Sequence, residues 1–110
     1  MSSRPVRTHW FTWRHLRCKV VEKPCDLGDH DTLLELHVIA ARDTPVPITT
    51  TGFLAHFLST AALTGAGGPT TFFTTWMDRE ARSRDYQLAE FLWRQGDLFD
   101  RLVPDEGRDA

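Results

Sequence analysis

Two alternating stretches constrain the fold of this chain more than any other feature. In residues 10–22 and again in residues 32–42, side chains of one character recur at every second position. A period of two, with many β-branched and aromatic residues, is typical of strands with one buried face. A loop rich in aspartate, with one proline and one glycine, separates them at residues 23–31. The sequence therefore predicts an antiparallel hairpin, and we expect these side chains to form its core: Leu16, Cys18, Val20, Leu34, Leu36 and Val38.

Helical spacing dominates the second half of the chain. Residues 53–62 place Phe, Leu and Ala side chains at positions i and i+4, which predicts a first helix. A second helix is predicted from Pro69 to Arg82, since proline is favoured in a first helical turn. Its buried side chains would be Phe72, Phe73, Trp76 and Met77. A third helix is predicted to begin after Ser83 and to end at Gly96, with a further turn over Leu98, Phe99 and Leu102 as the alternative. Its apolar face would carry Leu88, Phe91 and Leu92.

Length and composition place all these elements in one domain. The chain has 110 residues, of which 41% are hydrophobic and 25% are charged, which is ordinary for a folded domain. We expect an α+β fold over residues 1–104, followed by a frayed tail at residues 105–110. The predicted architecture is an antiparallel β-hairpin or small three-stranded sheet with two to three helices packed on one face.

Charge is distributed unevenly along the chain. Six of the thirteen basic residues lie within residues 1–23, whereas the formal net charge of the chain is −2. The overall balance excludes a strongly basic nucleic-acid coat protein and a very acidic DNA mimic. The basic segment predicts a patch for an acidic partner or for nucleic acid, and the alternative is a solvated face neutralised by the protein's own acids.

Targeting and membrane segments are not expected. The first ten residues contain no apolar run, and the most apolar stretch, residues 52–63, is too short to span a bilayer. The two cysteines are expected to be reduced thiols in a cytoplasmic protein that does not bind membranes.

Four residues suggest a metal site, but their spacing argues against one. His15, Cys18, Cys25 and His30 are of the types that hold tetrahedral zinc. Their intervals match no zinc finger, and on one strand His15 and Cys18 would point to opposite faces. We expect no metal and no cofactor, with a small zinc-binding protein as the alternative. The sequence also lacks a nucleophile elbow, a zinc-protease motif and a paired-carboxylate motif, so we expect no enzyme.

Aromatic residues followed closely by basic residues near the start of the chain predict the binding site. Because Trp10 and Trp13 have opposite parity on one strand, both cannot face the same core. We expect the partner on the outer side of the hairpin, where tryptophan and arginine are typical of binding hot spots. The alternative is that the N-terminal arm folds over the helices and hides them. The predicted partner-binding residues are Phe11, Trp13, Arg14, Arg17 and Lys19.

Several short motifs resemble those of known small proteins. The run from Thr44 to Phe57, the Gly-Gly-Pro at residues 67–69, the segment from Trp76 to Ala81 and the closing segment from Gln95 to Phe99 carry the resemblance. They resemble small accessory proteins carried on bacterial plasmids, phages and integrative elements, over roughly residues 10–99. The resemblance supplies no active-site residues. It implies a non-enzymatic accessory or inhibitor protein of a mobile genetic element that binds a host protein or ribonucleoprotein complex, such as an anti-CRISPR protein. The alternative is a nucleic-acid-binding protein that uses the basic aromatic strand.

Overall fold

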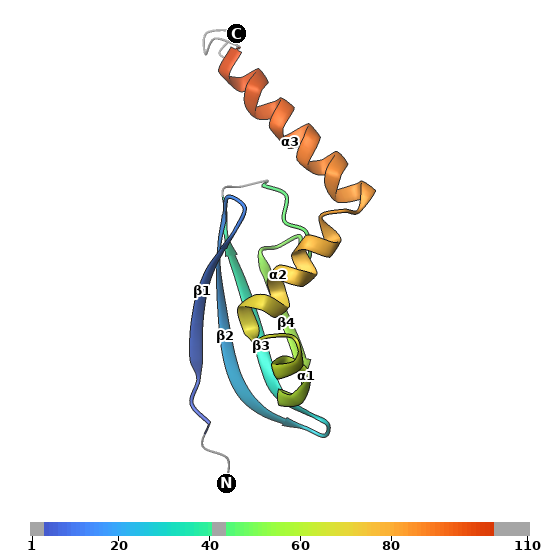
Figure 1. The fold of residues 1–110 in the computed structure, drawn as a ribbon. Helices are drawn as coiled ribbons and strands as arrows, with labels where there is room; N and C mark the ends of the chain where they lie inside the picture. The colour runs from blue at the N-terminus through green and yellow to red at the C-terminus, as the bar shows by residue number, and fades with distance from the viewer. Residues whose placement is uncertain (1–3, 41–43, 103–110) are drawn as a thin grey trace.

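A four-stranded antiparallel sheet with helices on one face forms the protein (Figure 1). The computed structural model describes residues 4–40 and 44–102, and their side chains as far as residue 95. The strands lie in chain order, each beside its neighbour in sequence. They are β1 (Arg7–Trp13), β2 (Leu16–Leu27), β3 (His30–Ile39) and β4 (Phe53–Leu58). The helices are α1 (Thr60–Gly65), α2 (Pro69–Glu80) and α3 (Arg84–Leu102). The predicted α+β class is confirmed, and the predicted tail at 105–110 lies outside the described residues.

A tight turn corrects the predicted first strand. Residues 10–22 are not one strand, because the chain reverses at Arg14 and His15, and Trp13 pairs with Leu16. Arg14 adopts a positive φ of 53°, which suits the first position of a two-residue hairpin turn. Residues that pair across the turn have their side chains on the same face of the sheet. Phe11 therefore lies beside Cys18.

The predicted loop at residues 23–31 is wrong for most of its length. β2 continues through a bulge between Pro24 and Leu27, and β3 already begins at His30. Only Gly28 and Asp29 form the turn, and Gly28 takes the positive φ of 63° that glycine adopts without strain.

The predicted first helix is also wrong over most of its length. Residues 53–58 form β4, which pairs with β3 so that Leu54 lies opposite Leu36 and His56 opposite Leu34. Leucine at both positions 54 and 58 fits a helical repeat and also a strand period of two. Pairing with β3 decides between them, because it satisfies the backbone hydrogen bonds on one side of the segment.

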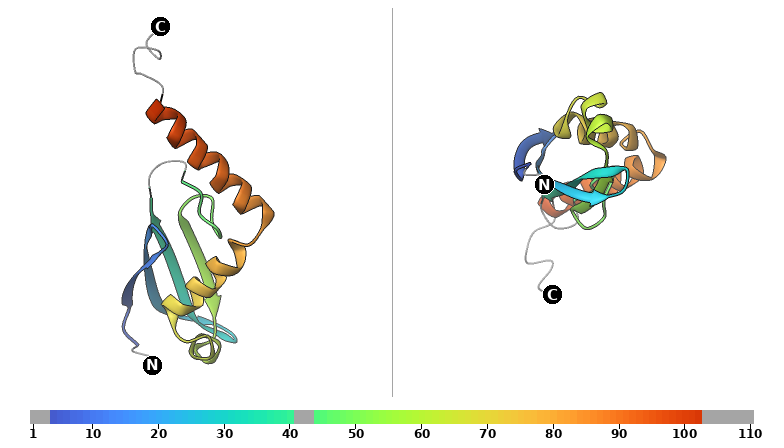
Figure 2. Two further views of the ribbon diagram at one scale, coloured as in Figure 1. Left: turned by 45° about the horizontal axis from the view of Figure 1, so that its top comes forward. Right: turned by 90° about the horizontal axis from the view of Figure 1, so that it is seen from below.

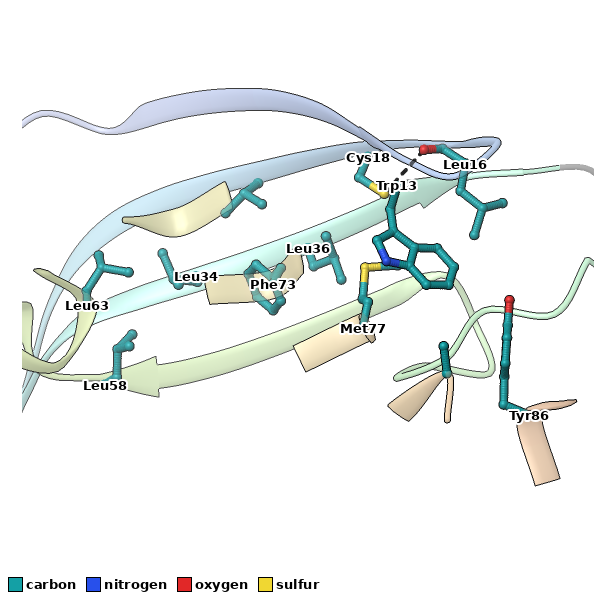
Figure 3. Close-up of a cluster of buried hydrophobic side chains, with 12 residues drawn as sticks. Trp13, Leu16, Cys18, Leu34, Leu36, Leu58, Leu63, Phe73, Met77 and Tyr86 are labelled. Carbon is teal, nitrogen blue, oxygen red and sulfur yellow. Dashed lines mark hydrogen bonds between the residues drawn. The ribbon is translucent and has the colours of Figure 1, made fainter. Parts of the chain in front are cut away.

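The core lies on the face of the sheet that α1 and α2 cover, here called the inner face (Figures 2 and 3). The predicted hairpin core is confirmed, since Leu36 and Val20 are fully buried opposite each other. From α2, Phe73 and Met77 fill the space above them, as predicted. The inner-face strand residues of the core are Phe11, Trp13, Leu16, Cys18, Val20, Leu34, Leu36, Val38, Leu54 and Leu58.

The third helix includes the further turn that the sequence offered, and it differs from its prediction in burial. Ser83 caps it, because its hydroxyl accepts a hydrogen bond from the Tyr86 amide at 3.1 Å. The helix runs past Gly96 to Leu102, beyond the end of the sheet (Figure 1). Its predicted core side chains are exposed: Leu88, Phe91 and Leu92 are each 56–57% accessible. Among the described residues, none of the helices is long and apolar enough to cross a bilayer.

Candidate binding surface

Two of the predicted partner-binding residues lie on the inner face, which corrects the prediction. Trp13 is only 3% exposed, and its indole nitrogen donates a 2.7 Å hydrogen bond to a carboxylate oxygen of Asp78. Phe11 packs against the same core. The turn at Arg14 is the physical reason, because it places Phe11 and Trp13 on the same face as Leu16. Neither aromatic side chain is available as an anchor on the outer side of the hairpin.

Arg14 lies at the turn, where it faces α3. Its guanidinium stacks over the Trp13 ring at 4.6 Å and lies 3.5 Å from a carboxylate oxygen of Glu90. His15 stacks on Trp93 with ring centres 5.5 Å apart. Together with the edge-to-face contact between Trp13 and Tyr86, these contacts attach α3 to the β1–β2 turn. Arg14 therefore has a structural role that its predicted binding role did not include.

The other two predicted residues, Arg17 and Lys19, lie on the opposite face of the sheet, here called the outer face. They gather around Trp10, whose ring centre is 4.6 Å from the Arg17 guanidinium carbon and 5.7 Å from the Lys19 ammonium. Trp10 is 49% exposed. A cation over an exposed indole ring is attracted to it by about 0.5–1 kcal/mol, so this cluster forms one aromatic and basic surface. Trp10 thus occupies the position on the outer face that the sequence analysis assigned to Trp13.

A second aromatic group lies on the outer face of β4. Phe53 and Phe57 are 44% and 42% exposed, and the His37 ring meets Phe53 edge to face at 4.9 Å. Sequence reasoning missed these residues, because it assigned them to the buried side of a helix. The signal that would have found them is their alternation with Leu54, His56 and Leu58.

Polar and apolar side chains of β2 and β3 lie between the two groups. Lys23 on β2 pairs with Glu35 on β3 at 2.9 Å, which neutralises both charges. The apolar side chains of Leu33 and Val21 lie between, half-buried, and Ile39 is 55% exposed at the end of β3. The outer face consists of Thr8, Trp10, Thr12, Arg17, Lys19, Val21, Lys23, Leu33, Glu35, His37, Ile39, Phe53, Ala55 and Phe57.

The four candidate metal ligands lie in separate places. Cys18 is buried in the core, and burial raises the pKa of its thiol to about 11. His15 is at the turn against α3, whereas Cys25 and His30 lie near the far end of the hairpin, where the Cys25 thiol contacts the His30 carbonyl at 3.3 Å. Within residues 4–40 and 44–102, no three histidine, cysteine or acidic side chains gather as a metal site would require.

An open cavity of about 360 Å³ lies between β4 and α2. His56 forms one wall, and its ring lies 5.3 Å from Phe72 and 5.2 Å from Trp76. Burial lowers the pKa of His56 below its ordinary value, and positive charge on His30 acts in the same direction. Thr75 and Arg79 complete the wall from α2.

Comparison with known proteins places the chain in a family. Residues 6–86 match the model of the family described as the KlcB third domain. This chain belongs to that family. The match begins just before β1 and ends in the first turn of α3, so it covers the sheet and the helices packed on it. No curated protein and no solved structure matches the chain.

Proposed function

We propose that this member of the KlcB third domain family is a non-enzymatic protein-binding module whose partner contacts the outer face. One observation carries the proposal: the outer face exposes four large apolar side chains, each 42–55% accessible, although the core is built on the inner face. They are Trp10, Ile39, Phe53 and Phe57. Exposed apolar surface bordered by charge is typical of interaction sites in soluble proteins.

The Trp10 cluster is the expected anchor of this interface. Tryptophan and arginine contribute most to binding when an interface buries them, and Arg17 already lies over the Trp10 ring. Little side-chain entropy is then lost on association. The partner would place apolar groups against Trp10 and acidic groups near Arg17 and Lys19.

A protein partner fits this face better than a nucleic acid does. Single-stranded nucleic acids bind surfaces where neighbouring aromatic rings stack on successive bases. Here the exposed rings are divided between the two edges of the sheet: Trp10 is on β1, whereas Phe53 and Phe57 are on β4, about 14 Å away at the usual strand spacing. One face of the Trp10 ring is already taken by Arg17. The resemblance to mobile-element accessory proteins supports an accessory or inhibitor role against a host protein or ribonucleoprotein complex, and anti-CRISPR inhibition is one form of that role.

The test identifies the partner and then measures where it binds. The partner is recovered from a host lysate with the immobilised chain, identified by mass spectrometry, purified, and titrated against wild type, Trp10→Ala and Leu88→Ala. We expect Trp10→Ala to weaken binding at least tenfold. Leu88→Ala, the matched control on α3, removes a similarly exposed apolar side chain and should leave affinity unchanged. Unchanged affinity in Trp10→Ala would contradict the proposal.

Salt separates the two classes of partner. A protein contact anchored on Trp10 should weaken less than about tenfold between 50 and 200 mM salt. A nucleic-acid contact that neutralises several phosphates should weaken by about 1,000-fold or more, through release of counterions. The larger loss, with nucleic acid in the recovered complex, would replace this proposal with the nucleic-acid alternative.

A further inference from the structure

The outer edge of β4 has backbone groups that the sheet does not use. β4 is the last strand of the sheet, and the carbonyl of Gly52 accepts a 2.7 Å hydrogen bond from the Val38 amide on β3. Alternate residues of an antiparallel strand bond to the same neighbour, so the peptide groups of Phe53, Ala55 and Phe57 point away from the sheet. Threonine side chains from the preceding loop satisfy only Phe53: its carbonyl accepts from the Thr49 hydroxyl at 2.8 Å. Within the described residues, no hydrogen bond to the outward groups of Ala55 and Phe57 is present.

The aromatic cavity lies beside this free edge. His56, on the edge strand β4, forms one wall of the cavity, while Phe72 and Trp76 line it from α2. Its volume of about 360 Å³ is within the range of pockets that hold a side chain or a small ligand. Arg79 also lines the cavity, and among the described residues it forms no ion pair. The site therefore combines unpaired backbone groups, an apolar hollow and a positive charge.

We propose that the edge of β4 binds an extended acidic peptide segment of a partner protein as a fifth strand of the sheet. The backbone of the peptide would hydrogen-bond to Ala55 and Phe57, and a large apolar side chain would enter the cavity. A strand added at the usual spacing of about 4.8 Å places its inner-face side chain next to His56. An Asp or Glu two residues away lies on the same face, where it meets Arg79.

Charge favours an acidic peptide over a second copy of the chain. Two copies joined edge to edge through β4 would form an isologous pair, in which each cavity faces its symmetry mate. That arrangement brings the two Arg79 side chains toward one junction, and the described residues that line the cavity include no carboxylate. An acidic peptide supplies the missing negative charge, and it uses a surface separate from the Trp10 cluster on β1.

The proposal is tested with random heptapeptides displayed on phage and selected against the immobilised chain. The most enriched sequence is then made as a fluorescein-labelled peptide, and its dissociation constant is measured by fluorescence polarisation. We expect the selected peptides to carry a large apolar residue and an acidic residue two positions apart. Selection of basic peptides, or of peptides without this pattern, would overturn the proposal.

Two variants examine the backbone and the charge separately. Ala55→Pro removes one outward amide that the sheet does not use, and an edge strand tolerates proline at such a position. We expect Ala55→Pro to weaken binding of the labelled peptide at least tenfold, and Arg79→Gln to weaken that binding at least threefold. Trp10→Ala, on the outer face, should leave peptide affinity unchanged, so failure here is distinguishable from failure of the Trp10 site. Unchanged peptide affinity in both Ala55→Pro and Arg79→Gln would overturn the proposal.

Hydrogen exchange of the wild-type chain gives a reading that needs no variant. If Ala55→Pro fails to fold, as shown by circular dichroism, this measurement decides. We expect the peptide to slow exchange at the Ala55 and Phe57 amides at least tenfold. No slowing, or a concentration-dependent dimer that protects the same amides without peptide, would overturn the proposal in favour of an unused edge or a second copy.

Discussion

The two faces of the sheet differ in how far they bury a tryptophan side chain. Trp10 and Trp13 lie three residues apart on β1. Trp13 is 3% exposed and donates its indole hydrogen to Asp78, whereas Trp10 is 49% exposed under the cations of Arg17 and Lys19. Position in the strand, and not residue chemistry, decides which tryptophan stabilises the fold. The other remains on the surface.

The largest expected effect comes from truncating the two tryptophans in turn. Trp13→Ala removes a buried ring and leaves the Asp78 carboxylate without its donor, so we expect a loss of about 3–5 kcal/mol in the free energy of unfolding. Trp10→Ala should change it by about 0.5 kcal/mol or less, as is usual for surface sites. Urea denaturation of both variants measures the difference. Equal losses would mean that the two faces do not differ in this way.

A second comparison uses leucines on the central strand β3. Leu36 is fully buried on the inner face, and Leu36→Ala should cost about 2–4 kcal/mol. Leu33 is half-buried on the outer face, so the matched Leu33→Ala should cost clearly less. Thermal and urea unfolding of the pair give the values. A loss within error for Leu36→Ala would mean that the register of β3 is inverted.

Acid should lower the stability of the fold through His56, which lies on the inner face. Its pKa in the folded protein lies below the ordinary value of 6.5, because burial disfavours the charged ring. As the pH falls, the unfolded chain therefore takes up a proton on His56 before the folded protein does. The stability that the neutral ring contributes is present above pH 6.5, and it is lost as the pH falls through the pKa of His56 in the folded protein. We expect melting temperature to fall less between pH 7.5 and 5.5 in His56→Gln than in wild type. Parallel curves would show that His56 does not titrate in this way.

The smallest effect concerns the two thiols, and it is kinetic. Cys18 is on the inner face with a pKa of about 11, so its thiolate is scarce at pH 8. Cys25 is half-buried outside the core. We expect a thiol reagent to modify Cys25 first and Cys18 only when the chain unfolds. In Cys25→Ser, fast labelling should disappear; if it persists, Cys18 is accessible.

The sequence predicted the hairpin core because that core depends on a local pattern. Leu34, Leu36 and Val38 alternate without interruption, and only one register buries all of them. The second helix followed equally well from Pro69 and the spacing of its apolar side chains. Each of these features is a property of a short segment, which local reasoning can read.

The side chains of the outer face, where we propose that the partner binds, were not predictable to the same extent, because their placement depends on a single turn. The turn consists of Arg14 and His15, neither of which is the Gly, Asn or Asp that usually marks a two-residue turn. Arg14 also adopts a positive φ, which arginine seldom does. Because the prediction did not include that turn, it placed Trp10 and Trp13 on the wrong faces of the sheet. β4 was missed for another reason: its leucines fit two periods, and only pairing with β3 selects the strand.

The order of the strands has a consequence for how quickly the chain folds. Each strand lies beside its sequence neighbour, and two of the three connections are two-residue turns. Native contacts in the sheet thus close short loops, and topologies with local contacts fold faster than those that join distant segments. Hairpins form in about 1–10 μs. The first two hairpins, β1–β2 and β2–β3, can therefore assemble during synthesis before α2 has emerged, and the arrival of Phe73 and Met77 on their inner face would complete the cooperative unit.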